Sequence, residues 1–580
     1  MNSLDGGIPY AISSCSRLEV ISLQSNSLEG EVPQTLAQCS FLQQIVLSNN
    51  NLQGSIPFQF GLLPNLSIIL LSSNKLTGII PKLLGSSKSL TKVNLKNNSI
   101  SCEIPLALFN NTNLSYVDLS RNHLSGSIPP FSQTSLPLQF LSIAENNLSG
   151  EIPVSVGNIS SLSFLLLSQN NLQGSIPDSL CEIADLRILK LQYNNLLGIV
   201  PPALFNISSL TYLSLSNNQF VGTIPTNIGI TLPNIIELII GGNQFEGQIP
   251  MSLANSSNLK NLDIRNNLFT GHIPSLGLLS NLKILNLGTN KLQAGDWTFV
   301  SSLTNCTQLQ MLCLNFNGFE GKIPKSIANL SKSLEVLLLT ENKLIGDIPS
   351  EIGKLTGLNV LTFERNMLTG IFLTHLGEIP STLGDCLLLQ SLHLEVNFLK
   401  GSIPISIINL RGIIEMDLSQ KNLSGEIPEF FGSFSFLKIL NLSFNDLNGK
   451  VPKGGVFHNS SVVFIQGNNK LCATSPMLQL PLCVESPTKR KKIFYILAIL
   501  VPGDLDSYTE VALTWTYAQV LLRLDQFGAP NNFITECEAL RNIPHRHLMR
   551  VISLCSTFDP AGNEFKALIL EHMANGNLES

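Results

Sequence analysis

The chain has 580 residues, a formal net charge of −5 and only 13 % charged residues. No basic stripe accompanies the aromatic residues, so the composition argues against a nucleic-acid partner. The first residues, MNSLDGGIPY, lack the charged start and the apolar stretch of a secretory signal. We therefore expect either that the native start is missing or that the protein is not exported.

A repeat of 24 residues fills most of the chain. The segments LEVISLQSNSLEGEVP at Leu18, LQQIVLSNNNLQGSIP at Leu42 and LSIILLSSNKLTGIIP at Leu66 share the pattern L-x-x-L-x-L-x-x-N-x-L-x-G-x-I-P. The alternating leucines predict a short strand with one buried face. A single turn cannot bury its leucines alone, so the repeats predict stacked turns that share a parallel sheet. Nineteen repeats are visible, and the first is cut short at its own asparagine.

The asparagine of the pattern is expected at the bend after each strand, where its amide can pair with backbone groups that the bend leaves free. These asparagines are Asn2, Asn26, Asn50, Asn74, Asn98, Asn122, Asn146, Asn170, Asn194, Asn218, Asn243, Asn267, Asn290, Asn317, Asn342, Asn366, Asn397 and Asn445. Lys421 stands where the next asparagine is expected, and we interpret it as a slight weakening of one bend without a function of its own. The spacing of 31 residues after Asn366 is interpreted as a bulge left by a lost repeat, with a ligand-touching loop as the alternative.

This pattern resembles the plant-type leucine-rich repeat, over residues 1–452. The resemblance implies an α/β fold: a right-handed solenoid with a parallel concave sheet that presents a peptide or protein ligand site. The N-terminal cap of that family, with its own cysteine pair, has no counterpart here, which supports a truncated start.

The segment VPKGGVFHNSSVVFIQGNNKLCATSPMLQLPLC, Val451 to Cys483, resembles the C-terminal cap of plant receptor ectodomains. We assign this cap to residues 453–484. A cap is physically required, because the last turn would otherwise expose its leucines. The resemblance implies a disulfide between Cys472 and Cys483, and the alternative is two free thiols.

Thirteen N-x-S/T sequons precede Cys472, as in an exported glycoprotein, although many would arise by chance in a chain rich in Asn and Ser. The glycosylation candidates are Asn65, Asn97, Asn110, Asn113, Asn147, Asn158, Asn206, Asn255, Asn305, Asn329, Asn422, Asn441 and Asn459.

Residues 485–506 begin like a membrane anchor. The apolar run in KRKKIFYILAILVPGDLD covers nine residues, Ile493 to Val501, whereas a span needs roughly 20. The basic cluster precedes the run, opposite to the positive-inside bias, so the orientation is not secured. The sequence leaves membrane association open, and a buried or interfacial segment is the alternative.

After residue 506 the repeat is absent, and the motif F-x-x-E-x-x-x-L-x-x-x-x-H occurs at Phe533, Glu536, Leu540 and His545, followed by LILEHMANGNLES at the C-terminus. Through these motifs residues 507–580 resemble an incomplete N-terminal lobe of plant receptor-like Ser/Thr kinases. The match implies that Glu536 is the ion-pairing glutamate of the lobe's helix, and that Leu570, Glu571 and Met573 belong to the strand and hinge that hold adenine.

The intact family uses ATP and Mg²⁺, and phosphoryl transfer needs a Gly-rich loop, a strand lysine and metal-binding groups. This chain has no lysine between Lys492 and Lys566 and no G-x-G-x-x-G before the helix, and it ends before any H-R-D or D-F-G. We therefore expect no phosphate transfer, no catalytic or metal-binding residue and no cofactor in this chain. One internal deletion near residues 502–520, or an exon boundary placed wrongly there, accounts for both the broken span and the broken lobe.

Outward positions of the strands supply the candidate ligand surface, because side chains alternate along a strand. A column of mostly aromatic residues repeats every 24 positions: Tyr116, Phe140, Phe164, Ile188 and Tyr212. Polar candidates near this column are Asp118, Arg121, Glu145, Lys190, Gln192 and Tyr193. The alternative interpretation is that the column only packs on itself. A more charged patch follows at Asp263, Arg265, Glu364, Arg365, His393 and Glu395, and Cys313, also outward, is interpreted as inert.

The resemblance implies the ligand-recognition ectodomain of a plant receptor-like kinase that senses a peptide or a pathogen molecule. The implied partners are an extracellular peptide or protein ligand and a leucine-rich-repeat co-receptor, at the plasma membrane. Two alternatives stay open: an active receptor kinase, if the gene model is wrong, and a secreted interaction or inhibitor protein.

Overall fold

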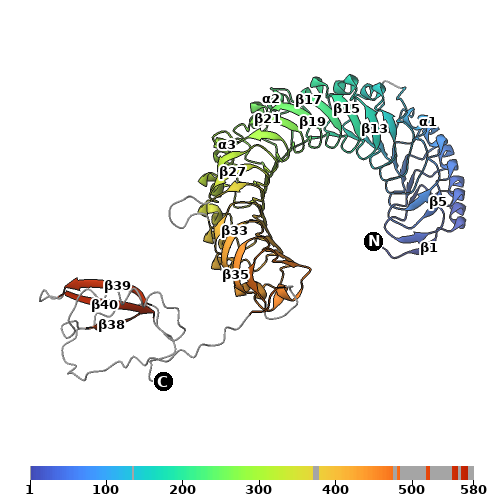
Figure 1. Cartoon of the computed structure of the whole chain (residues 1–580). Coiled ribbons are helices and arrows are strands. Elements are labelled where there is room, and N and C mark those ends of the chain that lie inside the picture. The colour runs from blue at the N-terminus through green and yellow to red at the C-terminus, as the bar shows by residue number, and fades with distance from the viewer. Residues whose placement is uncertain are drawn as a thin grey trace. The chain divides into compact units, whose positions relative to one another are not determined.

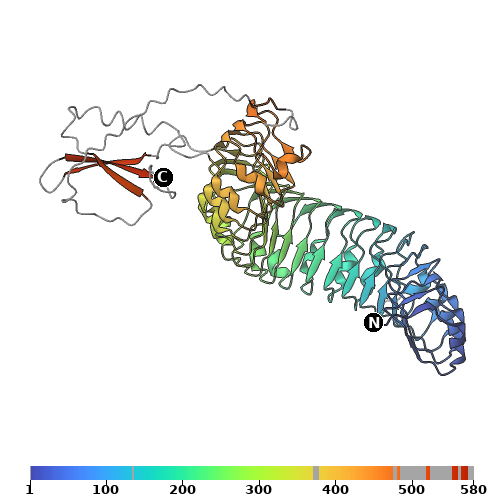
Figure 2. The same cartoon turned by 90° about the horizontal axis from the view of Figure 1, so that it is seen from below.

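The structure is a computed structural model that describes residues 2–132, 136–369, 378–473 and 480–483, and the backbone of three strands between residues 517 and 571. The chain divides into two compact units, Met1–Glu485 and Ser486–Ser580. In the first unit the turns stack along an arc with the short strands on its inner side (Figures 1 and 2).

One parallel sheet of 19 strands lines the concave face of the first unit. Strands β2 and β36 each pair on one side only, so the sheet is open at both ends. Its strands are β2 (Val20–Ser22), β4 (Gln44–Val46), β6 (Ile68–Leu70), β8 (Lys92–Asn94), β9 (Tyr116–Asp118), β10 (Phe140–Ser142), β12 (Phe164–Leu166), β14 (Ile188–Lys190), β16 (Tyr212–Ser214), β18 (Glu237–Ile239), β20 (Asn261–Asp263), β22 (Ile284–Asn286), β24 (Met311–Cys313), β26 (Val336–Leu338), β28 (Val360–Thr362), β30 (Ser391–His393), β32 (Glu415–Asp417), β34 (Ile439–Asn441) and β36 (Val463–Phe464).

The L-x-G-x-I segment of most repeats forms a second set of parallel strands beside the first, and the segments around Glu103 and Ser125 form only isolated bridges. These are β1 (Asp5–Gly7), β3 (Ser27–Glu29), β5 (Gln53–Ser55), β7 (Lys75–Thr77), β11 (Ser149–Glu151), β13 (Asn171–Gly174), β15 (Asn195–Ile199), β17 (Gln219–Thr223), β19 (Gln244–Gln248), β21 (Leu268–His272), β23 (Lys291–Gln293), β25 (Glu320–Lys322), β27 (Lys343–Gly346), β29 (Met367–Leu368), β31 (Lys400–Gly401), β33 (Asn422–Glu426), β35 (Asp446–Lys450) and β37 (Lys470–Cys472). The glycine adopts a left-handed conformation here; at Gly174, with φ 77°, a side chain would come within 2.8 Å of Glu151.

Short helices close most turns on the convex side, and the majority are 3-10 helices that begin after the proline of the repeat. The α-helices are α1 (Leu106–Phe109), α2 (Ile228–Thr231) and α3 (Thr298–Leu303). The 3-10 helices are η1 (Tyr10–Ser14), η2 (Gln34–Gln38), η3 (Phe58–Leu62), η4 (Lys82–Ser86), η5 (Val154–Asn158), η6 (Asp178–Glu182), η7 (Pro202–Asn206), η8 (Met251–Asn255), η9 (Lys325–Asn329), η10 (Ser350–Lys354), η11 (Ser381–Asp385), η12 (Ile405–Asn409), η13 (Glu429–Ser433) and η14 (Gly455–His458). Of the helices in the described part of the chain, none has both the length and the apolar character of a membrane span.

The asparagine row forms a ladder of buried and half-buried amides between the concave strands and the second strands. Asn146 is typical: its Nδ2 donates to the carbonyls of Leu119, Ile143 and Ala144, each at 3.1 Å. Its Oδ1 accepts the backbone N–H of Leu124 at 3.0 Å. Each asparagine thus joins its own bend to the preceding turn, and the leucines of neighbouring turns merge into one continuous core.

The ladder differs from the sequence pattern at both ends. Asn2 is exposed, and the first rung is Asn26, which accepts the N–H of Leu4. At the other end Asn468 makes the same contacts as the pattern asparagines, donating to Leu442 and Ile465 and accepting the N–H of Leu447. Since β36 also joins the concave sheet, the segment predicted as the cap, 453–484, continues the solenoid by one further turn before it closes.

The wider spacing after Asn366 leaves the sheet register intact, because Val360 in β28 pairs with Ser391 in β30. The extra residues fall mainly at 370–377, outside the described part of the chain.

The second unit contributes one antiparallel sheet of three strands in the order β38 (Tyr517–Leu522), β40 (Glu564–Glu571) and β39 (Val551–Phe558). Leu570 and Glu571 lie in β40, the central strand. Glu536 and Met573 lie outside the described residues, as does the apolar run at 493–501.

Candidate functional site on the concave face

The predicted aromatic column forms on the concave sheet. Strand register sets Tyr116 beside Phe140 and Phe140 beside Phe164, and the column continues through Ile188 to Tyr212. The Tyr116 and Phe140 rings stack at 4.3 Å between centroids, and those of Phe140 and Phe164 lie 5.7 Å apart. All five side chains are half-buried, so the column packs on itself and still shows part of its surface on the concave side.

A lysine that the sequence interpretation missed extends this column. Lys92, one strand earlier in β8, places its Nζ 4.3 Å from the centre of the Tyr116 ring. A cation over an aromatic face is attracted by the ring quadrupole. The 24-residue spacing could have identified Lys92, because it occupies the same repeat position as Tyr116 and pairs with it in the sheet.

Asp118 does not project freely from the sheet. It is 5 % exposed, and its Oδ1 accepts the hydroxyl of Ser120 at 2.6 Å and the Ser120 N–H at 3.1 Å. Burial, reinforced by the charge of Asp118, raises the pKa of the Tyr116 phenol to about 12. Tyr116 therefore stays neutral throughout the physiological range and can donate a hydrogen bond.

The remaining polar candidates differ in what they offer. Arg121 and Glu145 pair with each other at 2.9 Å on adjacent turns. Lys190 and Gln192 are half-buried, and Gln192 Oε1 has no hydrogen-bond partner among the described residues. Tyr193 is 52 % exposed, so it is the ring of this region that is most open to a ligand.

The charged patch further along the sheet is a network of partly neutralised groups. Arg265 lies 3.5 Å from Asp263, and Arg365 lies 3.4 Å from Glu341. Burial raises the pKa of the carboxyls of Asp263 and Glu364. Because Glu341 precedes Arg365 by 24 residues, the repeat spacing could have revealed this partner.

His393 lies between two carboxylates at one end of the charged patch. Its Nδ1 lies 3.6 Å from Glu395 and its Nε2 lies 3.9 Å from Glu415. The hydrogen bond to Glu395 raises the pKa of the imidazole, and burial opposes the shift. No group of three or more His, Cys, Asp or Glu residues with the arrangement of a metal site occurs among the residues that the structure describes.

Cys313 lies at the end of β24 but is only 4 % exposed. Burial raises the pKa of its thiol to about 12, and the nearby Asp263 adds to the shift. The thiolate is therefore scarce at neutral pH, which agrees with an inert side chain.

At the C-terminal end of the solenoid Cys472 and Cys483 form a disulfide, with their Cα atoms 4.8 Å apart. The bridge fastens the segment after β37 back onto the last turn, where Ala473 donates its N–H to Pro481.

The sequons are distributed over several faces of the solenoid. Eleven of the thirteen asparagines are exposed, and Asn110 and Asn441 are half-buried. Asn441 lies inside β34, and its Nδ2 donates to Asp417 at 2.7 Å. An amide engaged within the sheet is a poor acceptor for a glycan, which makes Asn441 the weakest of the candidates.

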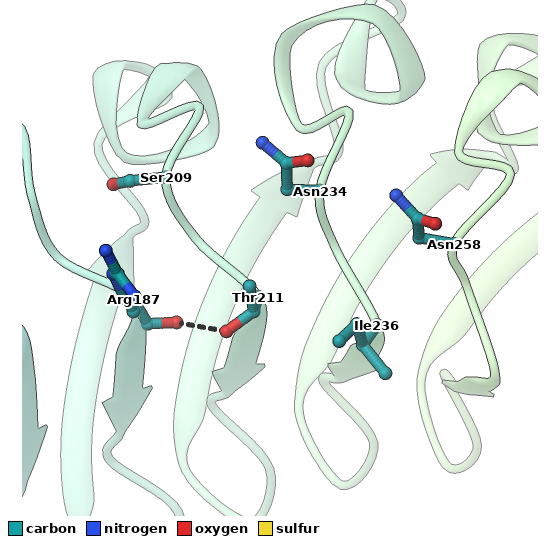
Figure 3. A pocket seen from close by; sticks show the side chains of 6 residues that line it. All are labelled: Arg187, Ser209, Thr211, Asn234, Ile236 and Asn258. Carbon is teal, nitrogen blue, oxygen red and sulfur yellow. Dashed lines mark hydrogen bonds between the residues drawn. The ribbon is translucent and has the colours of Figure 1, made fainter.

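A shallow hollow of about 440 Å³ lies at one edge of the concave sheet (Figure 3). Its lining comes from successive turns: Arg187, Ser209, Thr211, Asn234, Ile236 and Asn258. Most of its polar groups are engaged by the preceding turn; Thr211 Oγ1, for example, donates to the Arg187 carbonyl at 3.0 Å. The hollow is thus a consequence of turn stacking and offers only one exposed guanidinium.

The fold and the concave face define a leucine-rich-repeat recognition solenoid. The leucine-rich-repeat family model matches residues 41–63, 65–87, 209–229, 258–278, 308–330 and 333–355. A second model, the leucine-rich-repeat domain of the EGF-like domain-containing protein ComC, matches residues 86–196.

The curated relatives of similar sequence include plant receptor kinases. The chain is 30 % identical over 489 residues to the LRR receptor-like serine/threonine-protein kinase EFR of Arabidopsis thaliana. This match covers 52 % of this chain and 47 % of that protein. It is 48 % identical over 88 residues to the receptor kinase-like protein Xa21 of Oryza sativa subsp. japonica, covering 15 % of this chain and 8 % of that protein. The chain thus spans about half or less of the length of these curated relatives.

Solved structures of plant receptors are similar to this chain in both fold and sequence. The plant peptide hormone receptor RGFR1, in complex with RGF2, has a TM-score of 0.68 and 33 % identity, with 81 % of this chain and 76 % of that chain covered. The ectodomain of the Arabidopsis receptor kinase HAESA, in complex with an extended IDA peptide, has a TM-score of 0.71 and 31 % identity, with 82 % and 78 % covered. The chain therefore belongs to the family of plant leucine-rich-repeat receptor kinases, which it matches chiefly through the ectodomain.

Proposed function

We propose that residues 1–484 are a ligand-recognition ectodomain whose concave face binds an extracellular peptide or protein. Within this ectodomain residues 1–452 carry the repeats and 453–484 the cap, while 485–506 join it to the kinase-lobe remnant at 507–580. Two of the most similar solved ectodomains hold peptide hormones, RGF2 and IDA. The observation that carries the proposal is the half-buried stack from Lys92 through Tyr116, Phe140 and Phe164.

This stack suits a peptide for a physical reason. Rings that already pack on one another lose little rotamer freedom when a ligand covers them, so their contact area is available at low entropic cost. Aromatic residues also dominate the binding energy of many protein interfaces. Lys92 at one end of the stack and the exposed Tyr193 beyond its other end add polar contacts that would orient the chain of a peptide.

The proposed location is the plasma membrane, with the repeats outside the cell, and the proposed second partner is a leucine-rich-repeat co-receptor. A HAESA structure with 30 % identity and a TM-score of 0.64 contains both the peptide hormone IDA and the co-receptor SERK1. Fractionation of cells that express the whole chain tests the location. Recovery only in the secreted fraction would favour an interaction or inhibitor protein instead.

Binding to a displayed library of random 15-residue peptides tests the concave site. We expect that Phe140→Ser and Phe164→Ser each lower the affinity for the selected peptides by about tenfold or more, because a central aromatic anchor contributes at least ~1.4 kcal/mol of binding free energy. Val154→Ser is the matched control, since Val154 is 69 % exposed in η5 on the convex side. Equal loss in all three variants, or no loss in the first two, would refute a concave binding site.

A further inference from the structure

The asparagine ladder is interrupted at one buried position. Asn397 and Asn445, on either side, donate to the carbonyls of Leu394 and Leu418 respectively. By the spacing of the other rungs, an asparagine at 421 would donate to these two carbonyls and accept the N–H of Leu399. Lys421 stands there instead, and it is 5 % exposed.

The amine of Lys421 makes none of these contacts. Its Nζ is buried and has no hydrogen-bond partner among the described residues. A lysine ammonium has three donors and no acceptor, so it cannot replace the amide oxygen of a rung. A buried ionised group without a partner is costly, and the usual response is to shed the charge.

Two carboxylates act on Lys421 directly, and further ionisable groups surround them. Glu395, which follows β30, and Asp417 at the end of β32 both favour its charged form. Glu395 Oε2 is itself buried without a donor and contacts His393 through its other oxygen. His393 in turn approaches Glu415, and Glu364 adds its charge from the turn before. On the following turn Asn441, which is uncharged, donates to Asp417.

Burial has a larger effect on the pKa of Lys421 than the opposing charges of these carboxylates. Burial lowers the pKa of Lys421 to about 7, well below the ordinary lysine value of 10.5. In the closed turn the amine therefore changes charge near neutrality, while in an opened and solvated turn it stays charged until much higher pH. Proton binding consequently favours the opened turn.

We propose that the solenoid opens locally at the turn of Lys421 when the amine of this residue is protonated. Lys421 is buried near Glu395, at a position that an asparagine occupies in the other rungs of the ladder. We call this turn the Lys421 joint. The joint lies near the concave patch of His393, Glu395 and Asp417, since the charges of Glu395 and Asp417 act on Lys421. Its opening would therefore loosen that patch, whereas the aromatic stack around Phe140 keeps intact rungs at Asn122, Asn146 and Asn170.

The sign of the pH dependence follows from linkage. Below pH 7 the Lys421 amine is charged in both the closed and the opened turn, so the closed turn carries the full free-energy cost of a buried ammonium without a partner. This cost decreases as the pH rises from about 7, the pKa in the closed turn, to about 10.5, the pKa in the opened turn. The closed turn therefore gains stability across that window, by up to about tenfold in the opening equilibrium per pH unit.

Hydrogen exchange of the whole chain, followed by mass spectrometry at pH 6, 7, 8 and 9 and corrected for the intrinsic rate, tests the joint. We expect protection of the peptides within 394–423 to change little from pH 6 to 7 and then to rise by roughly tenfold per pH unit. Peptides from 146–170, where the rungs are intact, serve as an internal reference and are expected to show no such rise.

Two variants complete the experiment. Lys421→Asn restores the rung, so we expect high protection of 394–423 at every pH and no tenfold rise per pH unit above 7. Lys438→Asn, at an exposed lysine on the next turn, removes the same charge and should leave the dependence in place. His393 titrates in all three proteins, so its contribution cancels in the comparison. A flat profile in the unmodified chain, or the same slope in Lys421→Asn, would overturn the proposal.

Discussion

At the scale of single residues, two neighbouring asparagines show how position decides the value of a side chain. Asn170 is 8 % exposed and donates to Ile143, Leu167 and Ser168, while its Oδ1 accepts the N–H of Leu148. Asn171, the next residue, is exposed at the start of β13. The first closes a bend between two turns, and the second faces water.

Replacement of these two asparagines should therefore have unequal effects. Asn170→Ala leaves a buried N–H and several carbonyls with fewer partners, so we expect a loss of about 2–4 kcal/mol of local stability. Asn171→Ala should change stability by less than about 0.5 kcal/mol. Hydrogen exchange of peptides from 143–172 measures both. Similar losses in the two variants would contradict the structural role of the ladder.

The cysteines provide a second prediction at this scale. Cys15 is exposed, whereas Cys313 is buried with its pKa raised to about 12. Because the thiolate is the reactive species, iodoacetamide at pH 8 should modify Cys15 within minutes and leave Cys313 almost unmodified until the chain is denatured. Peptide mass spectrometry with and without urea distinguishes the two. Early modification of Cys313 would show that β24 opens readily.

At the scale of elements, some of the convex helices pack so closely that only glycine fits at their contact. A Cβ at Gly384, in η11, would collide with the backbone carbonyl of Ser406 in η12. A Cβ at Gly412 would meet only the Leu389 carbonyl, at 4.0 Å. At this contact the distance between successive turns is thus limited on the convex side by Gly384, while strand pairing sets it on the concave side.

Gly384→Ala should accordingly push η11 and η12 apart and cost about 1–3 kcal/mol, the usual penalty of overpacking. Gly412→Ala should be tolerated, since its new methyl group meets ordinary van der Waals space. Thermal unfolding followed by circular dichroism compares the two variants. A Gly412→Ala variant as unstable as Gly384→Ala would mean that the loss comes from backbone freedom and not from turn spacing.

At the scale of the whole molecule, the solenoid is nearly one-dimensional, because each turn contacts mainly its neighbours. The end turns then limit stability, since each has a neighbour on one side only. At the C-terminal end the disulfide between Cys472 and Cys483 holds a closing segment against Ala473 and the last turn. We therefore expect this closing segment to keep the last turn from fraying.

Removal of this bridge tests that view. The double variant Cys472→Ser and Cys483→Ser should lose about 2–4 kcal/mol at the C-terminal turns. We expect protease cleavage to begin after residue 440 and to leave the turns around Asn146 protected. Uniform cleavage along the chain would instead indicate that the solenoid unfolds as one cooperative unit.

The repeat spacing alone determined the stacked turns, the ladder and the aromatic column, because each depends only on local alternation and on one residue recurring every 24 positions. The resemblance to plant ectodomains supplied the pairing of Cys472 with Cys483.

Only the tertiary structure decided the environment of each outward side chain, since that environment comes from residues 24 positions away on two neighbouring turns. Asp118 turned inward to Ser120, Lys92 covered Tyr116, and Asn441 was engaged by Asp417. Lys421 is the sharpest case: its place in the row was plain from the sequence, but the cost of its buried charge depends on the low-polarity space that stacking creates.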